Sequence, residues 1–101
     1  MIHVIAHIEV KPGTLEDFLK AFKDNVPAVL AEEGCVEYQP AIDIEADMDS
    51  QNKNPNRVIV IEKWESLAHL DAHSKAPHMI TFRESAGSMI EKIHLNVLQN
   101  G

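Results

Sequence analysis

The sequence has little cysteine, few aromatic residues and no long apolar run. Its single cysteine, Cys35, cannot form an intrachain disulfide, so a reducing cytoplasm is the expected location. Cys35 follows Gly34 and opens an apolar stretch, which favours a buried, unreactive thiol over a nucleophile. The first ten residues alternate between apolar and polar side chains, so they predict a strand and neither a signal peptide nor a membrane span.

Motifs for several common chemistries are also absent. The sequence contains no glycine-rich phosphate loop, no dinucleotide fingerprint and no Ser–His–Asp grouping. Sixteen acidic residues against nine basic ones give a net charge of −7. Such a charge repels phosphate backbones and anionic membrane surfaces, so we expect neither nucleic acid nor membrane as a partner.

The 101 residues are enough for one domain, and the pattern predicts a single domain over residues 1–101. Apolar periodicity and turn residues predict four strands at 2–10, 35–45, 57–64 and 93–98, a helix from Thr14 to a stop at Gly34, and two short helices starting near Ser66 and Pro77. The order β-α-β-β-α-β predicts an α+β, ferredoxin-like sandwich. In that fold, helices cover one face of a four-stranded antiparallel sheet.

Local residues add four finer expectations. Thr14 and Asp17 have the spacing of a capping box, and Pro27 should kink the first helix or start a new turn. Pro40 cannot donate to a ladder, so the second strand should lie at a sheet edge or carry a bulge. The polar segment 46–56 should form an exposed loop.

Apolar residues occur on both faces of two predicted strands. In the third strand Val58 and Val60 point one way while Ile59 and Ile61 point the other. A small domain with helices for only one side of its sheet gains from a partner on the other side. We therefore expect a homodimer, with the face that carries His3, Ile5 and His7 turned towards the second copy.

Three of the six histidines fall within ten positions: His69, His73 and His78. One hypothesis is a metal site completed by Asp71 or Glu65. It is disfavoured because known zinc sites combine such histidines with a cysteine or a glutamate in a set register that is absent here. No bound metal is expected.

The second hypothesis is acid–base chemistry, since imidazole titrates near neutral pH. His73 and His78 flank the break between the two short helices, where a cleft can open onto the sheet. Candidate apolar walls of a substrate pocket are Trp64, Met79, Phe82 and Tyr38. An equally simple interpretation is that these side chains only fill the core. His69 is expected to face solvent.

His73 is the favoured base of the two. It ends a helix, where the negative end of the dipole stabilises an imidazolium. His78 lies in the first turn of the next helix, where a neutral imidazole that orients or hydrogen-bonds a substrate oxygen is better suited.

Three stretches together are similar to a known family: VIAHIEVKPG at 4–13, VPAVLAEEGCVEY at 26–38 and IEKWESLAHLDAHSKAPHM at 61–79. They resemble the antibiotic biosynthesis monooxygenase superfamily, most of all its bacterial members that oxidise menadiol-type quinols. The resemblance implies a dimeric ferredoxin-like α/β barrel. It also implies an enzyme that oxidises quinols or other phenolic substrates with O2, without a metal or an organic cofactor.

Other functions within and outside this superfamily remain open. Members that degrade haem differ from this sequence at three positions, occupied here by Ala6, His73 and Arg83, which disfavours haem degradation. A relative that processes a phosphorylated quorum-sensing signal shares the spacing of His73 and His78. A third alternative is a stress protein that binds quinones or small aromatics without turnover.

Overall fold

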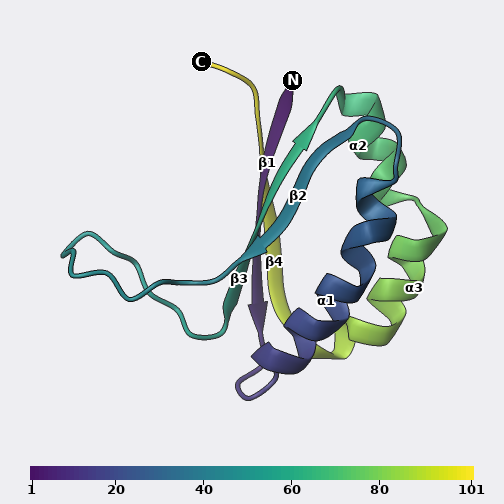
Figure 1. Ribbon diagram of the computed structural model, residues 1–101. Coiled ribbons are helices and arrows are strands. Elements are labelled where there is room, and N and C mark those ends of the chain that lie inside the picture. Colours follow the sequence, from purple (N-terminus) through teal and green to yellow (C-terminus); the bar gives the residue numbers. More distant parts are fainter.

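A computed structural model describes all 101 residues, which form a four-stranded antiparallel sheet with its helices on one face (Figure 1). The elements in chain order are β1 (Ile2–Val10), α1 (Leu15–Leu30), β2 (Cys35–Ala41), β3 (Arg57–Trp64), α2 (Leu67–Ser74), α3 (Pro77–Ala86), a 3-10 turn η1 (Gly87–Met89) and β4 (Ile90–Leu98). The strand order in the sheet is β2-β3-β1-β4. The predicted ferredoxin-like α+β fold is confirmed.

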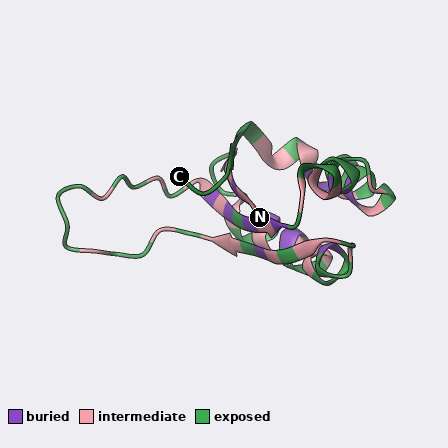
Figure 2. Ribbon diagram, turned by 90° about the horizontal axis from the view of Figure 1, so that it is seen from above, coloured by how far each residue is buried: buried purple, intermediate pink, exposed green.

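The core lies between the sheet and the helices, where most of the buried residues gather (Figure 2). Strand alternation puts every second residue of β1 and β3 on this side. The largest fully buried side chains are Val4, Val10, Phe18, Val29, Val58, Val60 and Trp64. Each contributes roughly 1.5–3 kcal/mol of transfer free energy. This burial fixes the strand register, because a slip by one residue would expose the whole apolar set.

The helices leave one part of this side uncovered. Strand β4 pairs with β1 so that Ile93, Leu95 and Val97 stand beside Ile8, Ala6 and Val4 on the helix side of the sheet. All three β4 side chains are nevertheless exposed. An apolar rim thus remains open beside the core.

Helix α1 differs from expectation at its start. Thr14 forms no side-chain capping bond, so the predicted capping box with Asp17 is wrong. The Thr14 hydroxyl instead donates to the carbonyl of Lys11 at 2.6 Å. That bond closes the preceding turn and engages the hydroxyl that a cap requires. The helix continues through Pro27 to Leu30.

Strand β2 is shorter than predicted and ends at Ala41 instead of residue 45. The last pair of its ladder joins Ala41 to Ile59, and β3 begins only two residues earlier, at Arg57. Residues 42–45 therefore have almost no strand to pair with. They join the predicted loop in an arm, residues 42–56, that projects away from the helices (Figure 1). Pro40 lies on an edge strand, as predicted. Strand β4 starts three residues earlier than predicted, at Ile90.

Gly34, which precedes β2, lies against the His69 side chain of α2. Its φ of +81° lies in the left-handed region, and a Cβ there would overlap the His69 ring. Gly13 has a similar φ of +87°, but nothing lies within 4 Å of a Cβ placed on it. The two glycines thus have similar backbone strain and differ in the space around them.

We expect Gly34→Ala to destabilise the fold more than Gly13→Ala. Both substitutions carry the left-handed cost of about 1–3 kcal/mol, and only Gly34→Ala also displaces an imidazole. Urea unfolding of the two variants measures the difference. Adding His69→Ala to Gly34→Ala should recover part of the extra loss, because it removes the overlapping ring but keeps the Cβ of residue 69, which lies 2.7 Å from the added Cβ. Equal destabilisation by the two single substitutions would contradict this account.

Candidate active site

An apolar cavity of about 280 Å³ lies between the sheet and the helices, next to the uncovered part of β4. Ten of its 14 lining residues are hydrophobic. The lining consists of Ala6, Ile8, Phe22, Tyr38, Val60, Glu62, His73, Ser74, Met79, Phe82, Arg83, Ile90, Ile93 and Leu95. Such a lining, with few polar groups, is typical of a site for a small aromatic molecule.

The structure brings together most of the residues that the sequence singled out. Tyr38, His73, Met79 and Phe82 all line this cavity. Trp64 does not line it; the indole is fully buried, and its ring centroid lies 4.7 Å from that of His73. Trp64 thus forms the support behind the histidine. The positions of Ala6 and Arg83, compared above with haem-degrading proteins, also line the cavity.

His73 is buried and held by a carboxylate that sequence reasoning missed. Its Nδ1 lies 2.8 Å from Oε2 of Glu32, which follows the end of α1. A carboxylate only accepts hydrogen bonds, so Nδ1 carries the proton and donates. The other ring nitrogen, Nε2, makes no hydrogen bond to a protein group, and His73 lines the cavity. The imidazole therefore presents its second nitrogen as a candidate proton acceptor.

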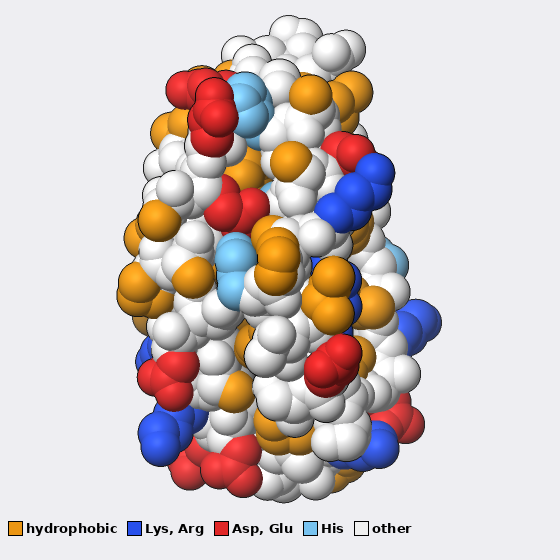
Figure 3. Space-filling view, turned by 90° about the vertical axis from the view of Figure 1, so that its right-hand side faces the viewer, with side chains coloured by type: hydrophobic (Ala, Val, Ile, Leu, Met, Phe, Trp, Pro, Cys, Tyr) orange, Lys and Arg blue, Asp and Glu red, His pale blue; other side chains and the backbone are white.

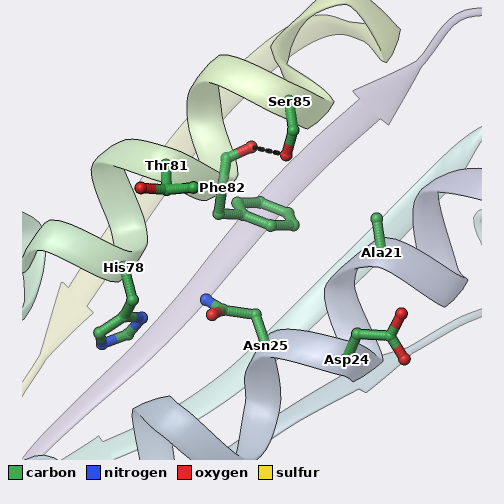
Figure 4. Close-up of a pocket in the computed structure, with 7 residues that line it drawn as sticks. All are labelled: Ala21, Asp24, Asn25, His78, Thr81, Phe82 and Ser85. Carbon is green, nitrogen blue, oxygen red and sulfur yellow. Dashed lines mark hydrogen bonds between the residues drawn. The ribbon is translucent and has the colours of Figure 1, made fainter.

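His78 shares the same carboxylate oxygen. Its Nε2 lies 3.1 Å from Oε2 of Glu32, and its Nδ1 is buried without a hydrogen-bond partner. The side chain borders a different hollow, between α1 and α3, with Asn25 and Phe82 beside it (Figure 4). His78 therefore touches Glu32 but does not line the apolar cavity.

The helix side of the surface carries no large patch of one charge. Acidic and basic side chains are dispersed over it, with histidines visible between them (Figure 3).

His69 is half-buried instead of facing solvent freely. Its Nδ1 lies 2.7 Å from the hydroxyl of Ser66, the residue that caps α2.

A second carboxylate, Glu62, lines the cavity from β3 and was also missed. It occupies the core side of the strand between Val60 and Trp64 and is 7% exposed. Oε1 accepts a hydrogen bond from Nε1 of Trp64 at 3.0 Å, and no Lys or Arg forms an ion pair with it. A glutamate in a core-facing position of an apolar strand is unusual, so the sequence itself contained evidence that Glu62 is special.

Burial raises the pKa of Glu62 from 4.5 to about 7, and the negative charge of Glu32 acts in the same direction. The hydrogen bond from Trp64 opposes the rise because it stabilises the ionised form. Near neutral pH the cavity therefore holds a carboxyl group divided between its acid and its anion.

Two further groups nearby stay protonated. Burial, with the charges of Glu62 and Glu32, raises the pKa of Tyr38 far above its usual range. The Tyr38 ring stacks on Phe22 at 5.4 Å and meets His73 edge-on, also at 5.4 Å. Burial also raises the pKa of the Cys35 thiol to about 11, which agrees with an unreactive cysteine.

Two kinds of feature are absent from the structure. No three side chains among the histidines, cysteines, aspartates and glutamates come together in a way that could hold a metal ion. None of the helices has the length and the apolar character needed to cross a membrane.

The sequence matches the model of the family described as antibiotic biosynthesis monooxygenase over residues 1–85. It is 39% identical to "Probable quinol monooxygenase YgiN" of Escherichia coli K12, over 100% of this chain and 99% of the relative. The chain belongs to the antibiotic biosynthesis monooxygenase family. The predicted resemblance is confirmed, and a monooxygenase-type oxidoreductase function follows from it at the level of the family.

Similar solved structures support the fold. A conserved protein from Methanosarcina mazei Go1 superposes with a TM-score of 0.83 at 25% identity, covering 99% of this chain and 92% of that one. The crystal structure of an antibiotic biosynthesis monooxygenase gives a TM-score of 0.83 at 22% identity, covering 100% and 99%.

The raised pKa of Glu62 predicts how stability changes with pH. Between pH 4.5 and 7 the folded state holds a proton that the unfolded state has lost, so stability falls as pH rises through this window. The total loss is roughly 3 kcal/mol.

Glu62→Gln should remove this dependence, because an amide does not ionise. Its free energy of unfolding relative to wild type should increase from pH 4 to pH 8, as measured by urea denaturation. Glu84→Gln, on the exposed side of α3, is the matched control and should keep the wild-type slope. Parallel pH curves for wild type and Glu62→Gln would contradict a raised pKa.

Proposed function

We propose that this protein is a cofactor-independent monooxygenase that oxidises quinols or related phenolic aromatics with O2. The observation that carries the proposal is the pairing of Glu32 with Nδ1 of His73 at 2.8 Å, beside an apolar cavity that His73 lines. The name of the Escherichia coli relative supports the substrate class. The absence of metal and organic cofactor is carried over from the sequence resemblance.

The reaction begins with proton transfer. A quinol binds with its ring among the apolar side chains, and Nε2 of His73 accepts the proton of one hydroxyl group. Glu32 keeps the imidazole oriented and stabilises the imidazolium that forms. The apolar lining offers few polar partners to water, so the electron-rich quinolate remains directly accessible to O2.

Oxygen chemistry follows on the substrate itself. The quinolate passes one electron to O2, and the resulting semiquinone and superoxide combine at a ring carbon. The peroxide takes up the proton held by His73 and loses water, which leaves a hydroxyquinone. Quinol and O2 are thus converted to hydroxyquinone and water, with no electrons required from elsewhere.

Two alternatives fit the site less well. A quinone-binding stress protein without turnover would need the cavity but has no use for a histidine held by a carboxylate. A phosphorylated ligand would meet the carboxyl group of Glu62 in the lining and would lie near the charge of Glu32, which is bonded to His73. The single lining arginine, Arg83, already donates from Nη2 to the carbonyl of Ser74 at 2.6 Å.

We expect oxygen uptake on addition of menadiol, above the spontaneous oxidation rate, by protein shown by elemental analysis to hold no stoichiometric metal. His73→Ala should lower turnover by roughly 10²-fold or more, the usual loss for a general base. His78→Ala should have a smaller effect, because His78 contacts Glu32 outside the cavity.

His69→Ala is the control, since His69 belongs to the same helix but does not line the cavity. Normal turnover by a folded His73→Ala would contradict the assignment of the base. Binding of menadione without any oxygen uptake would favour the stress protein instead. About one zinc, iron or copper per chain would contradict cofactor independence.

Assembly is a further part of the proposal. The sheet side without helices, here the open face, consists of Glu37, Gln39 and Ala41 on β2, Arg57, Ile59, Ile61 and Lys63 on β3, His3, Ile5, His7 and Glu9 on β1, and Lys92, His94, Asn96 and Leu98 on β4. The chain exposes 6530 Å², roughly 800 Å² more than a compact monomer of its mass. Part of that excess belongs to the projecting arm, residues 42–56. The open face itself presents Ile5, Ile59 and Ile61 on its two central strands. We propose that the open face packs against a second copy of the chain.

The homodimer should show twice the chain mass in light scattering at micromolar concentration. Ile61→Glu places a charge at the centre of the open face and should shift the protein to monomer. Ile80→Glu is the matched control, because Ile80 is an exposed isoleucine on α3, on the opposite side of the sheet. A monomeric wild type would contradict this proposal.

A further inference from the structure

The cavity contains a carboxyl group, Glu62, to which the proposed reaction has so far given no task. One oxygen is engaged by Trp64 at 3.0 Å. The second oxygen, Oε2, makes no hydrogen bond, and Glu62 lines the cavity. A buried carboxyl group with only one of its two oxygens hydrogen-bonded is costly in a core. Oε2 has no protein partner, so it is free to contact a ligand that enters the cavity.

Glu62 and the proposed base share two aromatic neighbours, Trp64 and Tyr38. Trp64 touches both groups, since it donates to Glu62 and packs against the His73 ring at 4.7 Å between centroids. Tyr38 also meets the His73 ring, at 5.4 Å. A substrate oxygen that reaches Nε2 of His73 therefore enters the surroundings of Glu62 as well.

The charges around Glu62 determine whether its ionised or its protonated form can stabilise a quinolate in the cavity. The titratable groups on the elements packed around it are Glu32, Cys35, Tyr38, His73 and Arg83. On the adjacent β1 strand its partner is the apolar Val4. Glu32 carries a negative charge, and the quinolate formed by His73 would add another. A third negative charge on Glu62 would repel that quinolate, whereas an uncharged carboxyl can donate a hydrogen bond to it.

Resting on the function proposed above, we infer that Glu62 is a second catalytic residue that acts in its protonated form. Oε1 stays bound to Trp64, and the O–H on Oε2 donates to the substrate oxygen as His73 removes its proton. Glu62 transfers no proton in this step; it stabilises the negative charge that develops on the substrate. Its raised pKa, about 7, keeps much of the acid form available near neutral pH.

The substitution Glu62→Gln distinguishes a hydrogen-bond donor from a carboxylate base at this position. The amide of Glu62→Gln retains an acceptor for Trp64 and a donor for the substrate, and it never ionises. Glu62→Leu keeps the side-chain size but removes both groups. Glu84→Gln, exposed on α3, controls for the loss of one negative charge. Thermal unfolding confirms that each variant is folded.

The first experiment measures binding without turnover, with 4-nitrophenol as the probe. Its phenolate absorbs visible light, and the fluorescence of the only tryptophan, Trp64, reports binding. At pH 6, wild type and Glu62→Gln should stabilise the bound phenolate, while Glu62→Leu should bind it about 10-fold or more weakly. Above pH 7 the affinity of wild type for the phenolate should fall, and that of Glu62→Gln should not.

The second experiment measures kcat/KM for menadiol against pH. Wild type should lose activity above about pH 7 as Glu62 ionises. Glu62→Gln should keep activity and lose this alkaline decline, and Glu62→Leu should lose roughly 10²-fold, as expected for removal of a donor to a developing oxyanion. If Glu62→Gln is as inactive as Glu62→Leu, the inference is wrong, and Glu62 acts as a carboxylate base.

The outcomes also separate this inference from the proposed function. Absence of both probe binding and oxygen uptake in wild type would overturn the proposed function, and this inference with it. Uptake that is unchanged in Glu62→Leu would overturn the role of Glu62 alone. An alkaline decline that persists in Glu62→Gln would assign that pH dependence to another group and would likewise overturn it.

Discussion

One carboxylate oxygen, Oε2 of Glu32, holds the helix layer to the candidate site. It accepts a hydrogen bond from His73 on α2 at 2.8 Å and another from His78 on α3 at 3.1 Å, while Glu32 itself follows α1. Three elements thus meet at a single atom. Because the His73 ring is fixed by this bond and by the indole of Trp64, its free nitrogen has a defined position in the cavity. A base needs that preorganisation to act within hydrogen-bond reach of a substrate.

The arrangement of the fold could be predicted from the sequence because burial follows simple periods. The alternation from Ile2 to Val10 and the helical stripe that contains Phe18 and Phe22 each have one solution that buries an apolar face. The predictions were wrong where an element's boundary or cap depends on a strand partner or a specific hydrogen bond. Strand β2 stops at Ala41 because β3 begins at Arg57, and Thr14 bonds backward to Lys11 instead of capping the helix. Local pattern carries no information about either choice.

The site was predictable only in part, for a related reason. His73 was proposed for its proton chemistry, and three apolar side chains were proposed as walls of the pocket. All four line the cavity: His73, Met79, Phe82 and Tyr38. Glu32 was not found, since it lies 41 positions from His73 and looks like an ordinary charged residue at a helix end. Long-range polar pairs leave no period in a sequence. Glu62 is different, because a glutamate at a core-facing position of an apolar strand breaks the alternation of the sequence itself.

Carboxyl groups in and beside the cavity disfavour negatively charged ligands. Glu32 and Glu62 are both carboxyl groups near an apolar space, and the nearest arginine, Arg83, is engaged by a backbone carbonyl. A neutral quinol can enter such a cavity at little electrostatic cost, whereas an aromatic carboxylate or phosphate would bring a second negative charge next to Glu32. In the proposed reaction, charge appears on the substrate only after proton transfer to His73, when it is needed for reaction with O2. These acidic surroundings favour a neutral substrate. The inferred protonated Glu62 would then be the one carboxyl group that stabilises the new charge instead of repelling it.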